Sequence, residues 1–549
     1  MRYMYLIYNV DPYGANGSTV VSNYSGNTLR QVSNNGSGLP SPGDIISEGA
    51  STTDDHTGVV TKVKVSDGTG TVTMMEENAS AKGWATIKVS GNVLGSGVTG
   101  WLQPNWNAAD PPLPPNAGAN SYALLESVAC PSATSCVAVG NYIDSSGSWQ
   151  GLIEAESGTS WIPTEVTLPD NADGDPNAYL VSVTCPSATK CVAVGYYNDG
   201  TAALLVTGSG TRWTATEAPL PANAQSGSYA YLTSVACPST TSCVAVGGYN
   251  GIFASDEVID TGPAGSGTNW TPTQATLPFN GLSFYNSSPP AVACMSASSC
   301  VTGWTYDDSS GNQQGVLESG SGINWTPGEV PLPANASTSN PEVVLGSGSE
   351  GTPLACSAAA CVMVGQYADS SGNTDGLLVT GSGTNWTQSE AQLPANASTG
   401  GHVALNTVAC ESAATCVAAG QYQDSSGNLQ GLMLTGLGTN WTPAAAPLPT
   451  NVLANPQVDL DSVTCPAASW CVTAGSYPAV APGGGQTIPG LAAIGAGTAW
   501  SATSVPLPGN VYSSTTNLMS VACPTKAFCV AVGGYYDGNW NGLLATGAP

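Results

Sequence analysis

Short runs of alternating or β-branched apolar residues recur along the chain after about residue 105, and Pro, Gly, Ser or Asp bound each run. Between residues 179 and 221 the runs are "YLVSVTC" (179–185), "CVAVGYY" (191–197), "AALLVTG" (202–208) and "RWTATEAPLP" (212–221). Apolar alternation between turn-forming residues is typical of β-strands. The pattern therefore predicts a unit of four strands and roughly 55 residues, which is the size of one propeller blade.

The same unit returns throughout residues 106–549. Sixteen cysteines form eight pairs, five or six residues apart within a pair, and the pairs recur every 52 to 62 residues from Cys130 to Cys529. Around them the repeat is "SVACPSATSCVAVGNY" at 127–142 and "SVACPSTTSCVAVGGY" at 234–249. A self-similar period of this length is typical of propellers, solenoids and arrays.

Two markers of the repeat are out of phase by one unit, and this offset predicts ring closure. Eight tryptophans occupy the fourth-strand position, namely Trp106, Trp161, Trp213, Trp270, Trp325, Trp386, Trp441 and Trp500. Trp106 precedes the first cysteine pair, whereas the last unit ends without a Trp strand. An N-terminal strand that completes the last blade would remove two exposed edges. We expect eight blades, with seven blades plus an irregular unit as the alternative.

The cysteines of each pair are predicted to form a local disulfide. Cys130 and Cys136 flank "PSATS", a hairpin loop, so their side chains can meet across two strands. An even number of cysteines indicates an oxidising compartment. The chain has only two histidines and no clustered Cys and His ligands, so we expect neither a metal site nor a cofactor.

Charge excludes several partners. Charged residues make up 8% of the chain and the net charge is −27. Binding to nucleic acid or an anionic membrane surface needs clustered Lys and Arg, and after residue 105 only Lys190, Arg212 and Lys526 are cationic. We therefore expect a secreted or cell-surface protein without nucleic-acid binding or membrane insertion, and a monomer.

The blade resembles the repeats of sialidase-like propellers, in which a Gly three residues before a Trp closes a turn that contains an Asp. The segment "TGSGTNWT" (380–387) has Gly383 and Trp386, but Gly381 stands in the place of that Asp. The resemblance implies the fold more than the activity. Sialidases also hold their substrate with an arginine cluster, and this propeller has one arginine.

Other recurring residues have simpler explanations. Asp144, Asp369 and Asp424 stand in equivalent "DSSG" hairpins, where an Asp normally accepts hydrogen bonds from its own turn. We expect the fourth-strand tryptophans to pack between blades rather than to stack on sugars. A propeller glycosidase would need two carboxylates converging in one pocket.

Residues 1–105 differ from the repeats, because they contain no cysteine and hold six of the nine cations. The motifs "PGDII" (42–46), "HTGVV" (56–60), "EEN" (76–78) and "GVTGWLQP" (97–104) resemble the CHAP domain, a papain-like module of bacterial cell-wall amidases and endopeptidases. The resemblance implies a small α+β papain-like domain over residues 1–105, here shortened at its N-terminus. The segment "MRYMYLIYNV" (1–10) would be the remaining end of a helix.

In that family a cysteine thiolate attacks an amide carbonyl, a histidine is its general base, and a Glu or Asn orients the imidazole. The resemblance assigns the base to His56 and the orienting partner to Glu76 or Asn78. By itself, His56 would be interpreted as a surface histidine at a strand end. The family's cysteine lies upstream of "PGD", where this sequence has none. Two explanations stay open: Met1 is an internal start, or the module has lost its nucleophile and only binds.

Together these features predict a cell-wall-directed protein with a CHAP-type module that cleaves an amide in peptidoglycan. The propeller would hold the enzyme on a glycan or protein surface. The alternative is a non-catalytic extracellular binding or adhesion protein, in which both parts are recognition surfaces.

Overall fold

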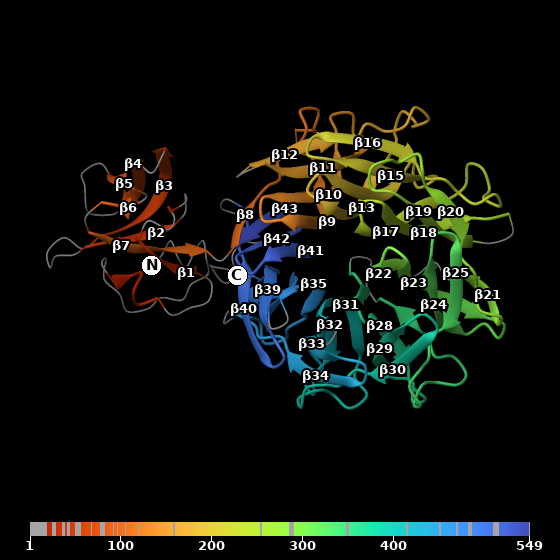
Figure 1. Ribbon diagram of the computed structural model, residues 1–549. Helices are drawn as coiled ribbons and strands as arrows, with labels where there is room; N and C mark the ends of the chain where they lie inside the picture. Colours follow the sequence, from red (N-terminus) through yellow and green to blue (C-terminus); the bar gives the residue numbers. More distant parts are fainter. Residues whose placement is uncertain are drawn as a thin grey trace. The chain divides into compact units, whose positions relative to one another are not determined.

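The computed structural model consists of strands, turns and loops (Figure 1). It describes residues 19–24, 29–35, 39–40, 44–49, 56–66, 69–76, 83–91, 93–95, 97–104, 106–119, 121–157, 160–252, 255–284, 290–346, 351–412, 415–449, 452–467, 470–480, 486–508 and 515–547. These residues contain no α-helix, and hence no helix able to cross a membrane. The helix expected at residues 1–10 lies outside the described residues.

The chain divides into two compact units, with the main boundary between Asn107 and Ala108. The first unit holds one antiparallel sheet with strand order β1-β7-β2-β3-β4-β5-β6. Its strands are β1 (Leu29–Ser33), β2 (Ile45–Glu48), β3 (His56–Ser66), β4 (Thr69–Glu76), β5 (Trp84–Ser90), β6 (Val93–Leu94) and β7 (Val98–Pro104). Ile46, Val60, Val72 and Trp101 are among the residues of its buried core. The motif "HTGVV" thus lies in β3, and Ile45 and Ile46 of "PGDII" lie in the neighbouring strand β2.

The second unit is an eight-bladed propeller, as the repeats predict (Figure 1). Five blades have four strands that are consecutive in the chain or nearly so: β9 (Ala123–Ser132), β10 (Ser135–Ile143), β11 (Trp149–Ser157), β12 (Ser160–Glu165); β13 (Tyr179–Ser187), β14 (Lys190–Tyr197), β15 (Ala202–Ser209), β16 (Arg212–Glu217); β17 (Ala230–Ser239), β18 (Ser242–Asn250), β19 (Ser255–Gly262), β20 (Thr271–Gln274); β31 (Val403–Ser412), β32 (Thr415–Gln423), β33 (Leu429–Leu437), β34 (Asn440–Ala445); and β35 (Asp459–Ala467), β36 (Trp470–Ser476), β39 (Gly490–Ala496), β40 (Ala499–Val505). A short hairpin, β37 (Ala479–Val480) with β38 (Gln486–Thr487), lies between β36 and β39 in the chain.

In the fourth and fifth blades the innermost strand is split into two short pieces. The fourth blade has β21 (Gly281–Phe284) and β22 (Ala291–Ser296), which both pair with β23 (Ser299–Asp308), then β24 (Gln313–Ser321) and β25 (Asn324–Glu329). The fifth has β26 (Val344–Leu345) and β27 (Leu354–Cys356), then β28 (Cys361–Ala368), β29 (Thr374–Ser382) and β30 (Asn385–Glu390). Prolines precede β22 and β27 in "SSPP" and "GTP", and proline cannot donate a ladder hydrogen bond.

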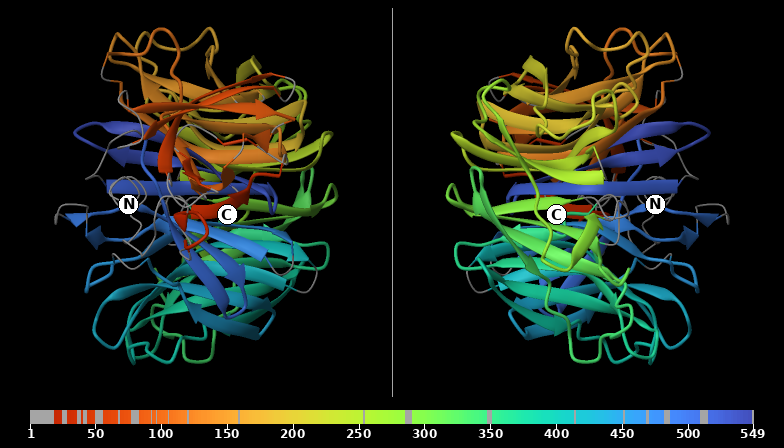
Figure 2. Two further views of the ribbon diagram at one scale, coloured as in Figure 1. Left: turned by 90° about the vertical axis from the view of Figure 1, so that its left-hand side faces the viewer. Right: turned by 90° about the vertical axis from the view of Figure 1, so that its right-hand side faces the viewer.

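The chain closes the ring as the offset of the two markers predicts. The eighth blade has the strand order β41-β42-β43-β8, so β8 (Trp106–Ala109) is the fourth strand next to β41 (Thr515–Thr525), β42 (Phe528–Tyr536) and β43 (Trp540–Gly547). The innermost strands contact one another in a closed circuit that returns from β41 to β9. Side views show the successive sheets following one another around the ring (Figure 2). Blade edges that would otherwise be exposed are therefore paired.

All sixteen cysteines form the predicted local disulfides, from Cys130–Cys136 to Cys523–Cys529. Each joins the first two strands of its blade. Each bridge closes a loop of only a few residues, so we expect about 2 kcal/mol of stabilisation from each in the chain-entropy model. Disulfides in this number fit an extracellular protein.

The fourth-strand tryptophans pack in the interior between blades, as expected. Trp106, Trp270 and Trp441 are almost fully buried, and the others pack at the edges of the core clusters. In five blades the indole N–H donates to the carbonyl oxygen of the residue three positions earlier, for example from Trp386 to Gly383 at 2.9 Å. Gly383 has φ of 57°, so a glycine suits this turn.

The Asp of the "DSSG" hairpins also acts as expected, because its carboxylate accepts hydrogen bonds from its own turn. Asp424 Oδ1 accepts from the backbone N–H groups of Ser426 and Asn428, at 2.9 and 3.0 Å. Hydrogen bonds from the Gln430 side chain and from Asn428 lower the pKa of Asp424 to about 2. Asp144 and Asp369 make the same backbone contacts.

A second repeated contact connects the loop before each blade to that blade. The Tyr142 hydroxyl lies 2.8 Å from both Asn116 Oδ1 and Glu165 Oε2, and the Asn116 side-chain amide donates to Glu165 Oε2 at 2.7 Å. The same Tyr–Asn pair recurs five times, in Tyr197–Asn171, Tyr249–Asn223, Tyr306–Asn280, Tyr367–Asn335 and Tyr422–Asn396. In these six "LPxN" segments the asparagine therefore satisfies a buried tyrosine hydroxyl.

Three blades carry a buried carboxyl in the third strand where the other blades carry an apolar residue. Glu154, Asp260 and Glu318 each pair with the residue two positions after the second cysteine of their blade. At the same register stand Val206, Val379, Leu434, Ala493 and Ala545. Burial raises the pKa of Glu154 to about 9 and that of Glu318 to about 7, and it raises that of Asp260 well above its usual value.

Ring closure gives a first prediction. Replacing Trp106 with Ala should lower the free energy of unfolding by about 3 kcal/mol or more, because this indole is 1% exposed in the closing strand. Trp213→Ala, at the same position of the second blade, is the matched control and should cost less because Trp213 is only half-buried. Thermal and urea unfolding of the full chain measure both effects. Equal midpoints for wild type and Trp106→Ala would disprove the closure argument.

The buried carboxyls predict that stability falls as pH rises. A carboxyl whose pKa is raised by folding stays protonated in the folded state while it ionises in the unfolded state. This difference in protonation does not lower the free energy of unfolding below pH 4.5, and for Glu154 the loss of stability grows up to about pH 9. Urea midpoints should therefore decrease between pH 5 and pH 9, and Glu154→Gln should flatten that slope.

Asp424→Asn is the control for this slope, because the pKa of Asp424 is lowered. The carboxylate of Asp424 stabilises the fold above its unfolded pKa of about 3.8, and this contribution is lost as pH falls toward 2. The substitution should leave the slope between pH 5 and pH 9 unchanged. A wild-type midpoint that rises over the same range would contradict the assignment.

Candidate functional site

The six continuous innermost strands each contain a β-bulge at the same place. The register shifts between the Leu and the Ser or Thr of a repeated Leu-x-Ser/Thr-Val segment. The inserted residues are Glu126, Val181, Thr233, Asn406, Asp461 and Met519. Their neighbours hardly change from blade to blade, whereas the inserted residue differs every time. A bulge turns a side chain away from the regular alternation, so this position can vary without disturbing the ladder.

The glycine of the "CVAVG" repeat permits this bulge. Gly140 of β10 pairs with Leu125 of β9, next to the inserted Glu126. A Cβ atom on Gly140 would collide with the carbonyl oxygen of Leu124, and Gly195 stands in the same relation to Tyr179. The bulged strand therefore approaches its neighbour more closely than any side chain would allow.

The serine after the bulge joins neighbouring blades. Ser127 Oγ accepts the backbone N–H of Val183 in the next blade at 3.2 Å. The same contact is made from Val292 to Ser234, from Val521 to Ser462 and, across the closure, from Val128 to Ser520. This set of hydrogen bonds joins the inner strands at four of the eight junctions between blades. We call it the serine belt.

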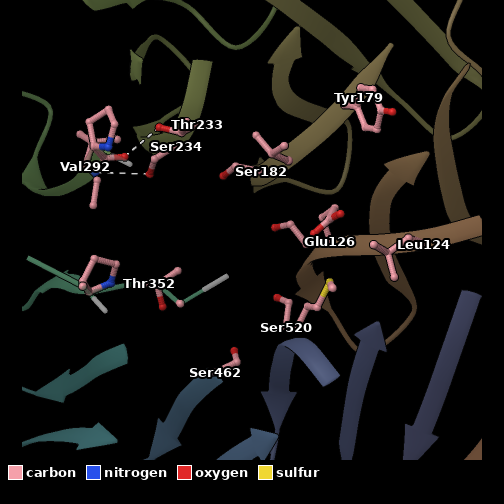
Figure 3. Close-up of a pocket in the computed structure, with 18 of the residues that line it drawn as sticks. Leu124, Glu126, Tyr179, Ser182, Thr233, Ser234, Val292, Thr352, Ser462 and Ser520 are labelled. Atoms are coloured by element: carbon pink, nitrogen blue, oxygen red, sulfur yellow. Dashed lines mark hydrogen bonds between the residues drawn. The ribbon is translucent and has the colours of Figure 1, made fainter. Parts of the chain in front are cut away.

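A cavity of about 560 Å³ lies within this ring of inner strands (Figure 3). Seven blades contribute residues to its wall. Hydroxyl groups of Ser127, Ser182, Thr233 and Ser462 line it together with apolar side chains. Among the described residues that line the cavity, Glu126 is the only carboxylate and none is Lys or Arg. The two converging carboxylates that a propeller glycosidase would need are therefore not found in this cavity.

Aromatic rings form a continuous row beside the cavity. The row consists of Tyr536, Trp540, Tyr122, Trp149, Tyr179 and Tyr196, and we call it the aromatic arc. Successive ring centroids are 5.8, 6.4, 4.7, 5.4 and 5.1 Å apart. Four of these rings line the cavity itself. Aromatic faces of this kind are common in ligand sites.

Blade geometry explains why these residues meet. In an antiparallel blade the first and third strands begin at the edge where the second strand ends. Trp149, Tyr179 and Trp540 are the first residues of β11, β13 and β43, whereas Tyr196 and Tyr536 lie at the ends of β14 and β42. The aromatic arc therefore occupies one face of the propeller and spans the eighth, first and second blades.

Tyr122, Tyr179 and Tyr196 of the arc keep their protons over the neutral range. Burial, followed by the nearby Tyr196, Asp199 and Tyr122, raises the pKa of Tyr179 to about 12. Burial and the Glu126 carboxylate raise the pKa of Tyr122, and burial is also the main cause of the raised pKa of Tyr196. Their hydroxyl groups can therefore donate hydrogen bonds to a ligand at neutral pH.

The predicted catalytic residues belong to the first unit. His56 is the half-buried first residue of β3 and pairs with Glu48 of β2. The Cα register places Glu76 opposite Gly58, two residues from His56, and Asn78 lies outside the described residues. Whether the three act as a catalytic set stays a prediction. No cysteine of the sequence has a free thiol, because all sixteen are in blade disulfides.

No group of His, Cys, Asp and Glu in the described part of the chain could hold a metal ion. No cofactor site is apparent from the residues around the cavity. Its lining offers hydroxyl groups, aromatic faces and one carboxylate, which suit hydrogen bonding and stacking.

The sequence matches no protein-family model and no curated protein. Among solved structures, the propeller is similar to a sialidase from Trypanosoma rangeli, at a TM-score of 0.31 and 10% identity over 60% of this chain and 57% of the sialidase. It is also similar to the six-bladed fucose-binding lectin of the fungus Aleuria aurantia, at a TM-score of 0.29 and 12% identity over 61% of this chain and 99% of the lectin. The alignment thus spans little more than half of the sialidase. At these TM-scores the likenesses carry no argument about function.

The aromatic arc was not identified from the sequence, although a signal exists. The sequence prediction considered the fourth-strand tryptophans, which recur in every unit and turn out to be packing residues. Trp149 and Trp540 instead break the repeat. The third strands of the other blades begin with Ala202, Ser255, Gln313, Thr374, Leu429 and Gly490. A comparison of the units for what varies, rather than for what recurs, would have found both the arc and the inserted residues.

Proposed function

We propose that the chain is an extracellular binding protein whose propeller holds a glycan at the aromatic arc. The observation that carries this proposal is the continuous row of half-buried rings beside a hydroxyl-lined cavity. The apolar faces of sugar rings pack on aromatic side chains, while their hydroxyl groups need hydrogen-bond partners. The disulfides support an extracellular location, where cell-surface glycans such as peptidoglycan are available.

Binding is favoured over hydrolysis at this site. Glycoside hydrolysis normally uses two carboxyl groups on either side of the bond, and only Glu126 is available among the described residues that line the cavity. Peptidoglycan, or another cell-surface glycan, is the partner that both the arc and the CHAP-like motifs suggest.

A peptidoglycan amidase is the second candidate function. It is supported by the sheet that carries Ile45 and Ile46 of "PGDII" and the "HTGVV" motif on adjacent strands, with His56 at the beginning of β3. In this proposal His56 is the general base, Glu76 or Asn78 orients it, and the propeller holds the enzyme on the cell wall. The nucleophile must come from a cysteine other than those of the blades, because their thiols are oxidised.

Glycan binding predicts retention of the full chain on insoluble glycans. Pull-down on purified peptidoglycan, chitin and cellulose should retain the protein on at least one of them. The double variant Trp149→Ala/Tyr179→Ala should weaken retention by at least about tenfold, since aromatic residues dominate such contacts. Phe279→Ala is the control, because Phe279 is a fully exposed aromatic residue outside the arc. No retention on any glycan, or equal loss with the control variant, would refute the proposal.

The amidase candidate predicts that this sequence by itself does not lyse cell walls. A general base without a nucleophile retains little of the rate of a covalent mechanism. Turbidity of cell-wall suspensions should stay constant with this chain, and should fall with a version that carries an upstream cysteine-containing segment. His56→Ala should abolish that loss, and Glu76→Gln or Asn78→Ala should reduce it less. Equal activity with and without His56 would refute the papain-like assignment.

A further inference from the structure

The aromatic arc is a local feature of three adjoining blades rather than one site in each blade. Among the described third strands, only those of the first and eighth blades begin with Trp. The wall of the cavity opposite the arc contains Pro290, Leu345, Thr352 and Pro353, which offer no aromatic ring. A ligand that repeats around the ring would need equivalent positions in all blades. The asymmetry instead indicates one binding surface along one side of the cavity.

The rings of the arc are arranged for an extended ligand. Tyr179 and Tyr196 are stacked at 28°, and Trp149 is tilted by 32° to Tyr179. Tyr122 meets Trp149 edge to face at 75°, and Trp540 and Tyr536 continue the row into the eighth blade. A single sugar would cover only one or two rings. Consecutive rings at 4.7 to 6.4 Å offer a surface to several linked sugars.

Charge is distributed unequally between the two faces of the propeller. Its three cations all lie at the face opposite the arc. Lys190 is the first residue of β14, and the other end of β14 carries Tyr196 of the arc. Lys526 precedes β42, and the other end of β42 carries Tyr536 of the arc. Arg212 begins β16 opposite Ser209, which is the end of β15 away from the arc.

Two carboxylates, those of Glu126 and Asp199, interact with rings of the arc. Glu126 interacts electrostatically with Tyr122 and Tyr196, and Asp199 does so with Tyr179. A carboxylate, sulfate or phosphate on a ligand would meet these charges with no cation to compensate them. Sugar hydroxyl and acetamido groups would instead find Glu126 as an acceptor and the tyrosine hydroxyls as donors.

We infer that the aromatic arc binds an extended, uncharged glycan chain that runs across the eighth, first and second blades. This inference rests on the proposed glycan binding and adds the class of glycan, its place and its direction. It excludes sialylated, uronic-acid and phosphate-containing chains as ligands of the arc. It also separates this face from that of a sialidase, which needs arginines at its site.

Isothermal titration of the full chain with oligosaccharides of increasing length tests the inference. The uncharged probes are N-acetylglucosamine, its dimer to hexamer, and β-1,4-glucose oligomers of the same lengths. The anionic probes are sialyllactose, hyaluronan oligomers and oligogalacturonate. For at least one uncharged series we expect affinity to rise at least about tenfold from the monosaccharide to the tetramer, and no binding of the anionic series.

Variants locate the ligand. Trp149→Ala and Trp540→Ala should each weaken tetramer binding at least about tenfold, because each removes a ring from a different blade of the same row. Trp149→Phe should retain part of the affinity, and Phe279→Ala should leave it unchanged. Equal melting temperatures of the variants would establish that the fold is intact. Glu126→Gln should weaken the discrimination against anionic chains, and it should also weaken the binding of uncharged chains because the carboxylate acceptor is lost.

Three results would overturn the inference while leaving glycan binding in place. They are tighter binding of an anionic series, equal affinity for the monosaccharide and the tetramer, and an affinity that depends on Trp149 but not on Trp540. If no soluble or insoluble glycan binds at all, the proposed function itself fails.

Discussion

The serine belt constrains the ring, because it connects the inner strands of neighbouring blades, which are separate sheets, at four of the eight junctions. Each inner strand has a free edge facing the axis, and its backbone groups need partners there. A serine hydroxyl from one blade accepts the N–H of a valine in the next, as in the pair Ser127 and Val183. The contact between Ser520 and Val128 closes the circuit between the last and first blades. These hydrogen bonds thus join neighbouring blades at their innermost strands.

The belt also explains why the site can vary. The serine reaches the next blade because a bulge precedes it, and the bulge is possible because a glycine lies opposite, as Gly140 does for Glu126. In the six blades with a continuous inner strand, geometry therefore favours Leu, Ser or Thr, Val and Gly at these positions. The inserted residue takes no part in the ladder, so it can be Glu126, Val181 or Met519 at no cost to the frame. Constant residues build the ring, and the residue between them sets the chemistry of the cavity.

The repeat architecture could be predicted from the sequence because the features that define it are local or periodic. Cysteine spacing gave the disulfides, strand alternation gave the blades, and the offset of Trp106 gave the closing strand. The arc could not be predicted in the same way, since Trp540 and Tyr122 are far apart in sequence and meet only after closure. The buried carboxyl of Glu154 was also missed, because an apolar core position is not expected to hold an acid. For His56, the resemblance predicts the role of general base, and the structure shows only its place at the beginning of β3.

The position of the arc at the closure connects stability with binding. Trp540 begins β43, the strand whose outer neighbour is β8. Tyr122 directly precedes β9, the first strand after the closing segment, and its ring lies 6.4 Å from that of Trp540. The two ends of the propeller sequence therefore supply adjacent rings of one surface. The eighth blade is held by β8 on one side and by Ser520 on the other, so Trp540 and Tyr122 become neighbours across the closure. The arc is complete only in the closed ring, so a ligand that spans it would itself favour closure by binding the closed state alone.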